Sequence, residues 1–376
     1  MWKQATAMAQ KPIYDFPGRM ARAREKMKER GLDALYVNAG PNMQYFAGWS
    51  AYPGGWPIWL SALIVPLEGE PTFVMSKMHA DILKYTKSWL KDGDVRTHMD
   101  GDDITGELGD ILTEKGLASG RLGVEDTMWY ADYELLTQAA PKVSVERAGE
   151  VFDGLRQVKD AGEIEAIRKA NEITVLGYQR AAEVIREGVA EYEAALEIMK
   201  VMLEGGSESM GVGGHFRTLL PRKFEKGDVI DIDMGARWDG YSTDTARNVF
   251  VGQPSKEVER AHRVTQEAFQ RTFEMVKPGI EAQEVHRFAW NYMKKHGYDQ
   301  LWKIGHGVGL NRGHEAPMVQ EGNTLILEPG IVFVIDPGCF ISGQFRDTPI
   351  HIEDVVVVTE TGCENLTHYT HEMIVV

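Results

Sequence analysis

Hydrophobic and polar positions follow two different periods along the chain. Apolar residues recur at helical spacing among charged ones over Phe16–Gly31, and Gly31 is placed to end the helix. A continuous apolar run at Ala34–Asn38 then predicts a buried strand. The same reasoning predicts strands at Ser61–Pro66 and Pro71–Met75, and helices around His79–Lys91 and Tyr130–Ala139. Because helices and strands alternate throughout, the pattern predicts a mixed α/β (α+β) fold class.

The clearest domain boundary lies near Val151–Asp160. Asp160 can cap a helix, and Glu163 completes a capping box three residues later. This helix is expected to run to about Arg186, and a second one from about Glu191 to Glu204. We therefore expect two domains, residues 1–155 and residues 156–376.

The order of elements repeats within the second domain. The first two helices precede a segment with strand-like alternation, Asp228–Phe250. Two more helices, Ser255–Val276 and Glu281–His296, precede apolar strands at Ile331–Ile335 and His351–Thr359. This order of helix, helix, strand and strand suggests an internal duplication with a pseudo-two-fold axis and a site between the halves.

The segment Asp228–Phe250 has the features of a β-hairpin. Two strand-like stretches flank the pair Asp239-Gly240, which is a strong turn signal. Asp233 and Asp244 lie on opposite strands, so pairing sets their carboxylates across from one another. Two such acids repel unless a positive charge lies between them, and a divalent cation would supply it. Two solvent-exposed strand acids are the alternative, and the hairpin alone does not decide between them.

The second half supplies further candidate ligands. His306 lies in IGHGVGL, where glycines allow a close approach of the backbone, and Asp336 ends the strand VFVID. Glu353 lies in HIEDVVVV, where alternation places His351 on the same face. Taken singly, these residues also fit a structural histidine, a turn acid and an edge-strand acid. Together with the hairpin acids they predict one common site.

Composition and charge limit the possible partners. The chain has 376 residues, of which 43% are apolar and 26% charged, as in soluble globular proteins. The net charge of −15 argues against a nucleic-acid or anionic-membrane partner. The two cysteines, Cys339 and Cys363, form no CxxC motif, which fits a reducing compartment. With neither a signal-peptide pattern nor a run of about 18 apolar residues, we expect a cytoplasmic protein.

Several segments, in order, resemble those of a known family. They are NMQYFAGW, LRQVKDAGEIEAIRKA, IDMGARWDGYSTDTAR, GHGVGL, LEPGIVFVIDPG and IEDVVVVTETGCENLT. The chain thereby resembles the pita-bread metallohydrolases, which include proline dipeptidases, Xaa-Pro aminopeptidases, methionine aminopeptidases and the metal-free creatinases. The resemblance covers nearly the whole chain. It implies a creatinase-type N-terminal domain followed by a pita-bread catalytic domain.

The resemblance also implies a metal centre with two divalent ions. Its ligands would be Asp233, Asp244, His306, Asp336 and Glu353, with Asp244 and Glu353 bridging the ions. Four carboxylates and one imidazole suit Mn²⁺, Co²⁺, Fe²⁺ or Zn²⁺. A hydroxide held between the ions would attack a scissile carbonyl that the ions polarise.

Other residues would act around this centre. His314 or His215 would stabilise the oxyanion or move a proton. In dimers of the family a loop from one subunit reaches the partner's site, so a homodimer is expected. Here the loop GWSAYPGGWPIW carries four aromatic residues that would hold a prolyl ring or a cation: Trp49, Tyr52, Trp56 and Trp59. Packing of this loop on its own domain is the alternative.

The chain departs from the family where protons would be transferred. Asp336 replaces a glutamate that also serves as general base, and His351 replaces a frequent arginine. His314 follows His306 by eight positions rather than seven, and His215 is only the nearest candidate for an upstream histidine. Asp231 faces the same way as Asp233, either as an extra ligand or as a strand acid bonded to backbone.

Four functions fit these observations to different degrees. The first is hydrolysis of a C–N bond in a dipeptide or another small amide. The second is a metal-dependent lyase acting on a small charged metabolite, because the family includes lyases that cleave a sulfonium propionate. In such a lyase, Asp336 or another carboxylate would abstract a proton. A metal-free creatinase-like amidinohydrolase disagrees with the presence of Asp233 and Asp244. A non-catalytic binding module disagrees with a chain that keeps four ligands and has the fifth as Asp.

Overall fold

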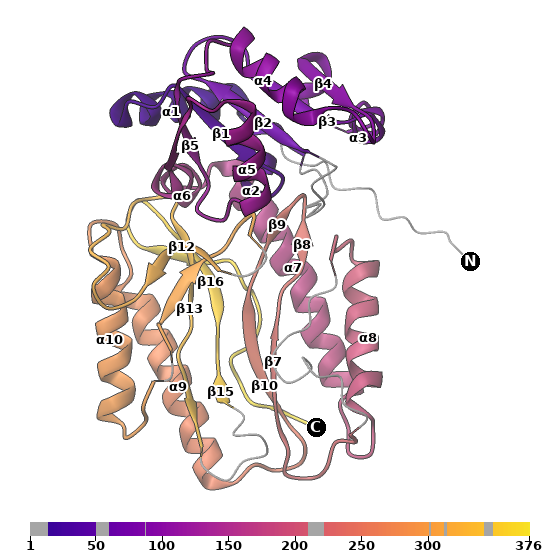
Figure 1. Ribbon diagram of the computed structural model, residues 1–376. Coiled ribbons are helices and arrows are strands. Elements are labelled where there is room, and N and C mark those ends of the chain that lie inside the picture. Colours follow the sequence, from indigo (N-terminus) through magenta and orange to yellow (C-terminus); the bar gives the residue numbers. More distant parts are fainter. Residues whose placement is uncertain are drawn as a thin grey trace. The chain divides into compact units, whose positions relative to one another are not determined.

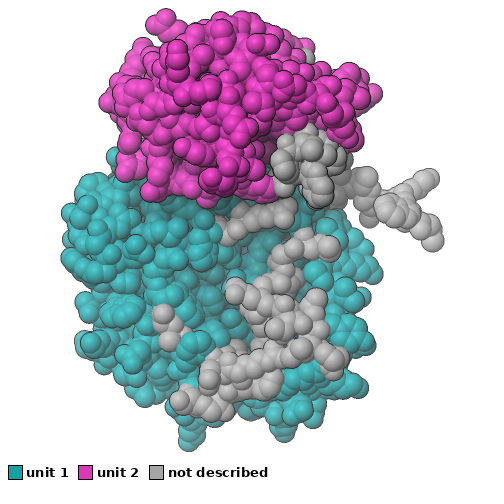
Figure 2. All heavy atoms as spheres, viewed as in Figure 1, with its two compact units in different colours: residues 1–13, 157–376 teal, residues 14–156 magenta. Residues whose placement is uncertain are grey.

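The computed structural model describes residues 14–49, 60–86, 88–209, 222–300, 302–311, 314–341 and 349–376. The chain forms two compact units, and Figure 2 colours them separately. We call residues 14–156 the N-terminal unit and residues 157–376 the C-terminal unit.

The N-terminal unit is built on one mixed sheet of six strands with the order β4-β3-β2-β1-β5-β6. Its strands are β1 (Ala34–Asn38), β2 (Ala62–Pro66), β3 (Thr72–Ser76), β4 (Asp94–His98), β5 (Arg121–Val124) and β6 (Ser144–Arg147). Its helices are α1 (Phe16–Arg30), α2 (Pro41–Ala47), α3 (Lys77–Leu83), α4 (Ile104–Glu114), α5 (Tyr130–Ala139) and α6 (Gly149–Gln157). Strands β1, β2 and β3 are buried along their whole length, which explains their continuous apolar sequences.

One predicted helix of this unit is wrong. The segment around His79–Lys91 contains α3, which ends at Leu83, and a separate 3₁₀ turn, η1 (Trp89–Asp92). Between them, the buried Ser88 hydroxyl donates to the Ala47 carbonyl at 2.6 Å and accepts from the Leu90 amide. These hydroxyl bonds compete with a continuing helix, and one of them depends on a distant part of the chain.

The C-terminal unit contains two helix pairs and the strands between them. Its helices are α7 (Ala161–Val184), α8 (Glu191–Glu204), α9 (Lys256–Met275) and α10 (Ala282–Lys295). Its strands in the first half are β7 (Val229–Met234), β8 (Arg237–Trp238), β9 (Tyr241–Ser242) and β10 (Thr245–Phe250). The later strands are β11 (Gly305–Gly307), β12 (Glu315–Val319), β13 (Val332–Ile335), β14 (Gly338–Phe340), β15 (Pro349–His351), β16 (Asp354–Val358), β17 (Cys363–Asn365) and β18 (Ile374–Val375).

These elements repeat the same order twice, as the sequence predicts. Helices α7 and α8 precede β7 and β10, and helices α9 and α10 precede β13 and β16. In the view of Figure 1, the first helix pair lies to the right of the strands and the second pair to the left. Each half has its own apolar core between its helices and its strands. The structure therefore confirms the mixed fold class and the repeated order.

Helix α7 begins as the sequence predicts. The Asp160 carboxylate accepts from the Glu163 amide at 2.9 Å, and the Glu163 carboxylate accepts from the Asp160 amide at 3.0 Å. This capping box satisfies two amides that the first turn of the helix leaves without partners.

A reciprocal pair of backbone hydrogen bonds is one of the connections between the halves of the C-terminal unit. The Ala246 amide donates to the Glu353 carbonyl at 3.1 Å, and the Glu353 amide donates to the Ala246 carbonyl at 3.2 Å. We call this pair the inter-half bridge. It connects the β10 end of the first half with the segment before β16.

No helix in the described part of the chain has the length and apolarity needed to cross a bilayer.

Candidate metal centre

The predicted hairpin is present, but its strands are interrupted. Strand β7 pairs with β10 so that Asp233 lies opposite Ala246, and β8 pairs with β9 around a tight turn. Both turn residues have positive φ, 50° at Asp239 and 87° at Gly240, as a two-residue hairpin turn requires. Asp244 lies in the interruption between β9 and β10. Asp233 and Asp244 are therefore diagonal neighbours and are not directly opposite each other.

The interruption has a steric cause. A Cβ atom added to Gly235 would lie 1.8 Å from the Thr243 carbonyl oxygen, so the two backbones approach more closely than any side chain allows. The Thr243 amide still donates to the Ala236 carbonyl at 3.1 Å. The hairpin thus stays paired around its irregular segment, which contains Asp244.

Three overlapping groups of side chains bring possible ligand atoms within 4.8 Å of one another. They are Asp233 with Asp244 and Glu353; His306 with Asp336 and Glu353; and Asp244 with His306 and His314. All five ligands predicted from the sequence thus lie together. Glu353 belongs to the first two groups, and Asp244 to the first and third. His306 belongs to the second and third groups.

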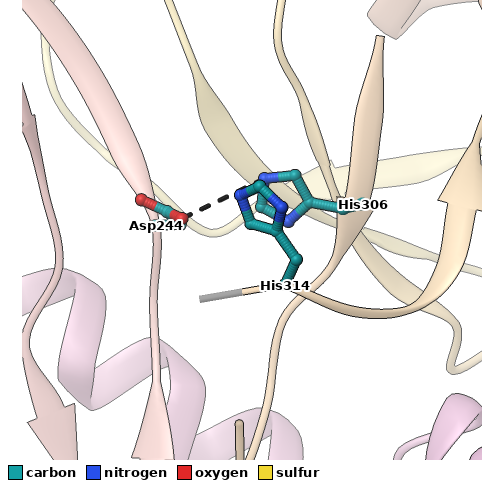
Figure 3. A group of neighbouring side chains, drawn as sticks. All are labelled: Asp244, His306 and His314. Carbon is teal, nitrogen blue, oxygen red and sulfur yellow. Dashed lines mark ion pairs between the residues drawn. The ribbon is translucent and has the colours of Figure 1, made fainter. Parts of the chain in front are cut away.

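His306 is oriented toward the acids. Its Nδ1 donates to the Gly307 carbonyl at 3.2 Å, which leaves Nε2 facing the Glu353 carboxylate at 3.4 Å and the Asp244 carboxylate at 4.0 Å. The His314 ring stacks on the His306 ring with a centroid distance of 3.7 Å (Figure 3). His314 is exposed, and the Lys303 ammonium lies 3.4 Å from its Nδ1. His314 therefore contacts His306 on one side and the solvent on the other.

Burial and mutual repulsion control the charge of the cluster. Burial, followed by the charge of Asp233, raises the pKa of Asp244 well above its ordinary value. Burial and the charge of Asp244 act in the same way on the pKa of Glu353. Burial lowers the pKa of His306 to about 3, so its imidazole is neutral near pH 7. Buried carboxylates beside a neutral imidazole form a donor set that fits hard or borderline divalent cations.

His351 lies among three carboxylates. Its Nε2 is 2.5 Å from Asp336 Oδ1 and 3.8 Å from Glu353 Oε2, and its Nδ1 is 3.4 Å from Asp231 Oδ1. Burial by itself would lower the pKa of His351, but Asp336 and Asp231 raise it well above its ordinary value. The sequence offered Asp231 as an extra metal ligand or as a strand acid bonded to backbone. The structure places it beside His351 instead.

The strand predicted at His351–Thr359 is interrupted. Strand β15 ends at His351 and pairs with β14, whereas β16 begins at Asp354 and pairs with β13. Glu353, between them, takes part in the inter-half bridge with Ala246. His351 and Glu353 still face the same cluster, as expected, but a break between two sheets places them there.

Sequence reasoning assigned no role to several residues that support the cluster. The Arg247 guanidinium pairs with the buried Asp354 at 2.6 Å and donates to the Ala246 and Glu353 carbonyls. The Trp302 indole donates to the Asp336 carbonyl at 3.1 Å, and its ring lies 5.0 Å from that of His351. Arg247 ends the matching motif, which was a usable signal. Trp302 had no comparable signal.

The remaining predicted residues are not part of this cluster as described. His215, Tyr52, Trp56 and Trp59 lie outside the described residues. The Trp49 ring packs within the N-terminal unit, 5.8 Å from the Phe73 ring and 6.2 Å from the His79 ring. For Trp49, this contact agrees with the alternative that the loop begins against its own domain.

Known proteins match this chain over nearly its full length. Residues 165–360 match the model of metallopeptidase family M24, and residues 19–158 match the creatinase/prolidase N-terminal domain. A probable dipeptidase, PepE, from Mycobacterium tuberculosis is 30% identical, over 95% of this chain and 96% of that protein. The Xaa-Pro dipeptidase of Pyrococcus furiosus is also 30% identical, over 93% and 97%. The prolidase structure from Thermococcus sibiricus has a TM-score of 0.86 at 28% identity, covering 97% of this chain and 100% of that one.

Proposed function

Because the chain belongs to metallopeptidase family M24, we propose that this metallohydrolase cleaves the C–N bond of Xaa-Pro dipeptides with two divalent ions. The observation that carries the proposal is the convergence of four carboxylates and one imidazole in one cluster, in which His306, Asp336 and Glu353 are buried and Asp233 and Asp244 are half-buried. Relatives named Xaa-Pro dipeptidase, aligned over more than nine-tenths of both chains, support the choice of substrate.

The overlapping groups suggest how the ions would be shared. Asp233, Asp244 and Glu353 would hold one ion, and His306, Asp336 and Glu353 the other. Mn²⁺, Co²⁺, Fe²⁺ and Zn²⁺ all suit these donors. When bound, the ions supply Lewis acidity, which polarises the scissile carbonyl and lowers the pKa of water toward neutrality.

The protein's own groups would orient the substrate and move protons. The exposed His314, stacked on His306, is placed to donate a hydrogen bond to a developing oxyanion. Asp336 would accept a proton, in the role that the resemblance gives to a glutamate at this position. His215 and the aromatic residues Tyr52, Trp56 and Trp59 are proposed to act on the substrate from the resemblance alone, and the homodimer rests on the same basis. The cytoplasmic location is proposed from the cysteine content and the lack of a signal-peptide pattern.

Metal analysis combined with a product assay tests the proposal. Protein purified without chelator should carry about two divalent ions per chain by elemental mass spectrometry, and should release proline from Xaa-Pro dipeptides. Asp244→Asn should lose both metal and turnover. Asp110→Asn, which changes an exposed acid in α4, should keep both. Full turnover by metal-free protein, or by Asp244→Asn, would overturn the proposal.

The products also separate hydrolysis from a lyase reaction. Hydrolysis adds one water, so the product masses together exceed the substrate mass by one water molecule. Elimination by a lyase leaves the summed mass unchanged. Asp336→Glu adds a further criterion, because it should raise peptidase turnover if the shorter acid is a weaker base. Product masses without added water, from any substrate that turns over, would favour the lyase.

A further inference from the structure

His351 holds one oxygen of Asp336 in a fixed position. A carboxylate oxygen can only accept, so at 2.5 Å the His351 Nε2–H donates to Asp336 Oδ1. The main chain of His351 is held by its backbone amide, which donates to the Asn248 side chain at 2.7 Å. The Trp302 ring packs against the His351 ring. This donor therefore has little freedom to move away from Asp336.

The backbone of Asp336 is fixed as well. Its amide donates to the Ile304 carbonyl at 2.7 Å, and its carbonyl accepts from Trp302 and from Gln300. With the main chain and Oδ1 both bonded, Oδ2 is the oxygen that Asp336 can offer to a cation. The Trp302 indole is a second hydrogen-bond partner of the carboxyl, but His351 is the partner bonded to Oδ1 at 2.5 Å, so the direction of Oδ2 depends on this bond.

We infer that His351 is a positioning residue that orients Asp336 and so determines the cation affinity of one half of the centre. The inference rests on the proposed function, since it assigns His306, Asp336 and Glu353 to one ion. In the other half, Asp233 with Asp244 and Glu353, the shared Glu353 has its Oε2 3.8 Å from His351 Nε2, which is beyond hydrogen-bond distance. Removal of the His351 donor should therefore weaken one half selectively. Bonds of this kind typically change metal affinity by about 10–100-fold.

Two substitutions that differ by one methylene test the inference. His351→Gln can place an amide N–H where Nε2 was, whereas the amide of His351→Asn reaches only the position of Nδ1 and loses Asp336. Metal-free proteins would be titrated with Mn²⁺ by calorimetry, and free Mn²⁺ counted by electron paramagnetic resonance. We expect two ions in the wild type and in His351→Gln. In His351→Asn, one ion should bind about 10–100-fold more weakly while the other keeps its affinity.

A second background checks that the effect passes through Asp336. Asp336→Asn should itself weaken the same ion, and adding His351→Asn to it should cause no further loss. Equal affinities in the Asn and Gln variants, or equal weakening of both ions, would overturn the inference but leave the proposed function intact. Wild-type protein that takes up no Mn²⁺ would overturn both. If His351→Asn is unfolded by circular dichroism, His351→Leu, which also lacks a donor toward Asp336, takes its place in both backgrounds with the same expected results.

Discussion

The buried ion pair between Lys159 and Glu315 allows a quantitative test of how the loop beside His314 is held. The ammonium lies 2.9 Å from Glu315 Oε1, and the side chains are 1% and 2% exposed. The other carboxylate oxygen accepts from the Asn311 amide at 3.2 Å. Lys159 therefore connects the start of the C-terminal unit to the segment that carries His314.

Lys159→Met keeps the side chain unbranched and only one atom shorter, and it removes the charge. At 2.9 Å and an effective dielectric constant of about 20, the lost attraction is about 6 kcal/mol, against which the cost of burying the ammonium must be set. Breaking a buried pair on one side typically lowers the free energy of unfolding by about 3–5 kcal/mol, because the buried carboxylate loses its attraction to the ammonium. Lys159→Met with Glu315→Gln should recover most of that loss.

Urea unfolding of chelator-treated protein, followed by far-ultraviolet circular dichroism, measures these differences. Chelation removes any contribution of bound metal to the measured stability. The control is Arg287→Met, which breaks an exposed pair with Glu321 whose side chains are 50% and 59% exposed, and should cost at most about 1 kcal/mol. The reasoning is refuted if Lys159→Met costs no more than this control, or if the double variant loses as much as the two single losses added.

Three further predictions concern backbone fit and pH. Gly235→Ala should lower the free energy of unfolding by about 3 kcal/mol, because its Cβ meets the Thr243 carbonyl. Gly154→Ala, in open space within α6, should raise it by about 0.5–1 kcal/mol, and the urea midpoints of the two variants compare them. Burial raises the pKa of Glu125 to about 7, so its contribution to stability is present below about pH 4.5 and lost as the pH rises through about 7; Glu125→Gln should remove about 3 kcal/mol of that pH dependence. The pKa values of Asp244 and Glu353 are also raised, so metal-free protein should lose stability as the pH rises, and Mn²⁺ should restore it. Melting temperatures that change with pH by the same amount in Mn²⁺ and in chelator would contradict this.

The sequence predicts local features better than contacts between distant segments. Asp239-Gly240 predicts the hairpin turn, and Asp160 with Glu163 predicts the start of α7, because each signal acts within a few residues. The interruption at Gly235 depends instead on how closely two backbones approach, which alternation of side chains does not encode.

The candidate site shows the same division. The spacing of its acids and the matching motifs indicate which residues gather, and the structure brings those five together. The contact of His351 with Asp336 could not be predicted, because it depends on the pairing of β14 with β15 and on the ring of Trp302. The helix predicted around His79–Lys91 is wrong for a similar reason, since Ser88 bonds the carbonyl of Ala47 across the fold.

The inter-half bridge has a consequence for the kinetics of folding. Ala246 and Glu353 are more than a hundred positions apart, and contacts at such separations slow folding because chain entropy is lost before they form. Ligands from the two halves come together only when these distant segments meet. A metal ion that binds the assembled centre after the transition state for folding would leave the folding rate unchanged and slow unfolding. The lifetime of the native state would then depend on metal supply, even where the rate of its formation does not.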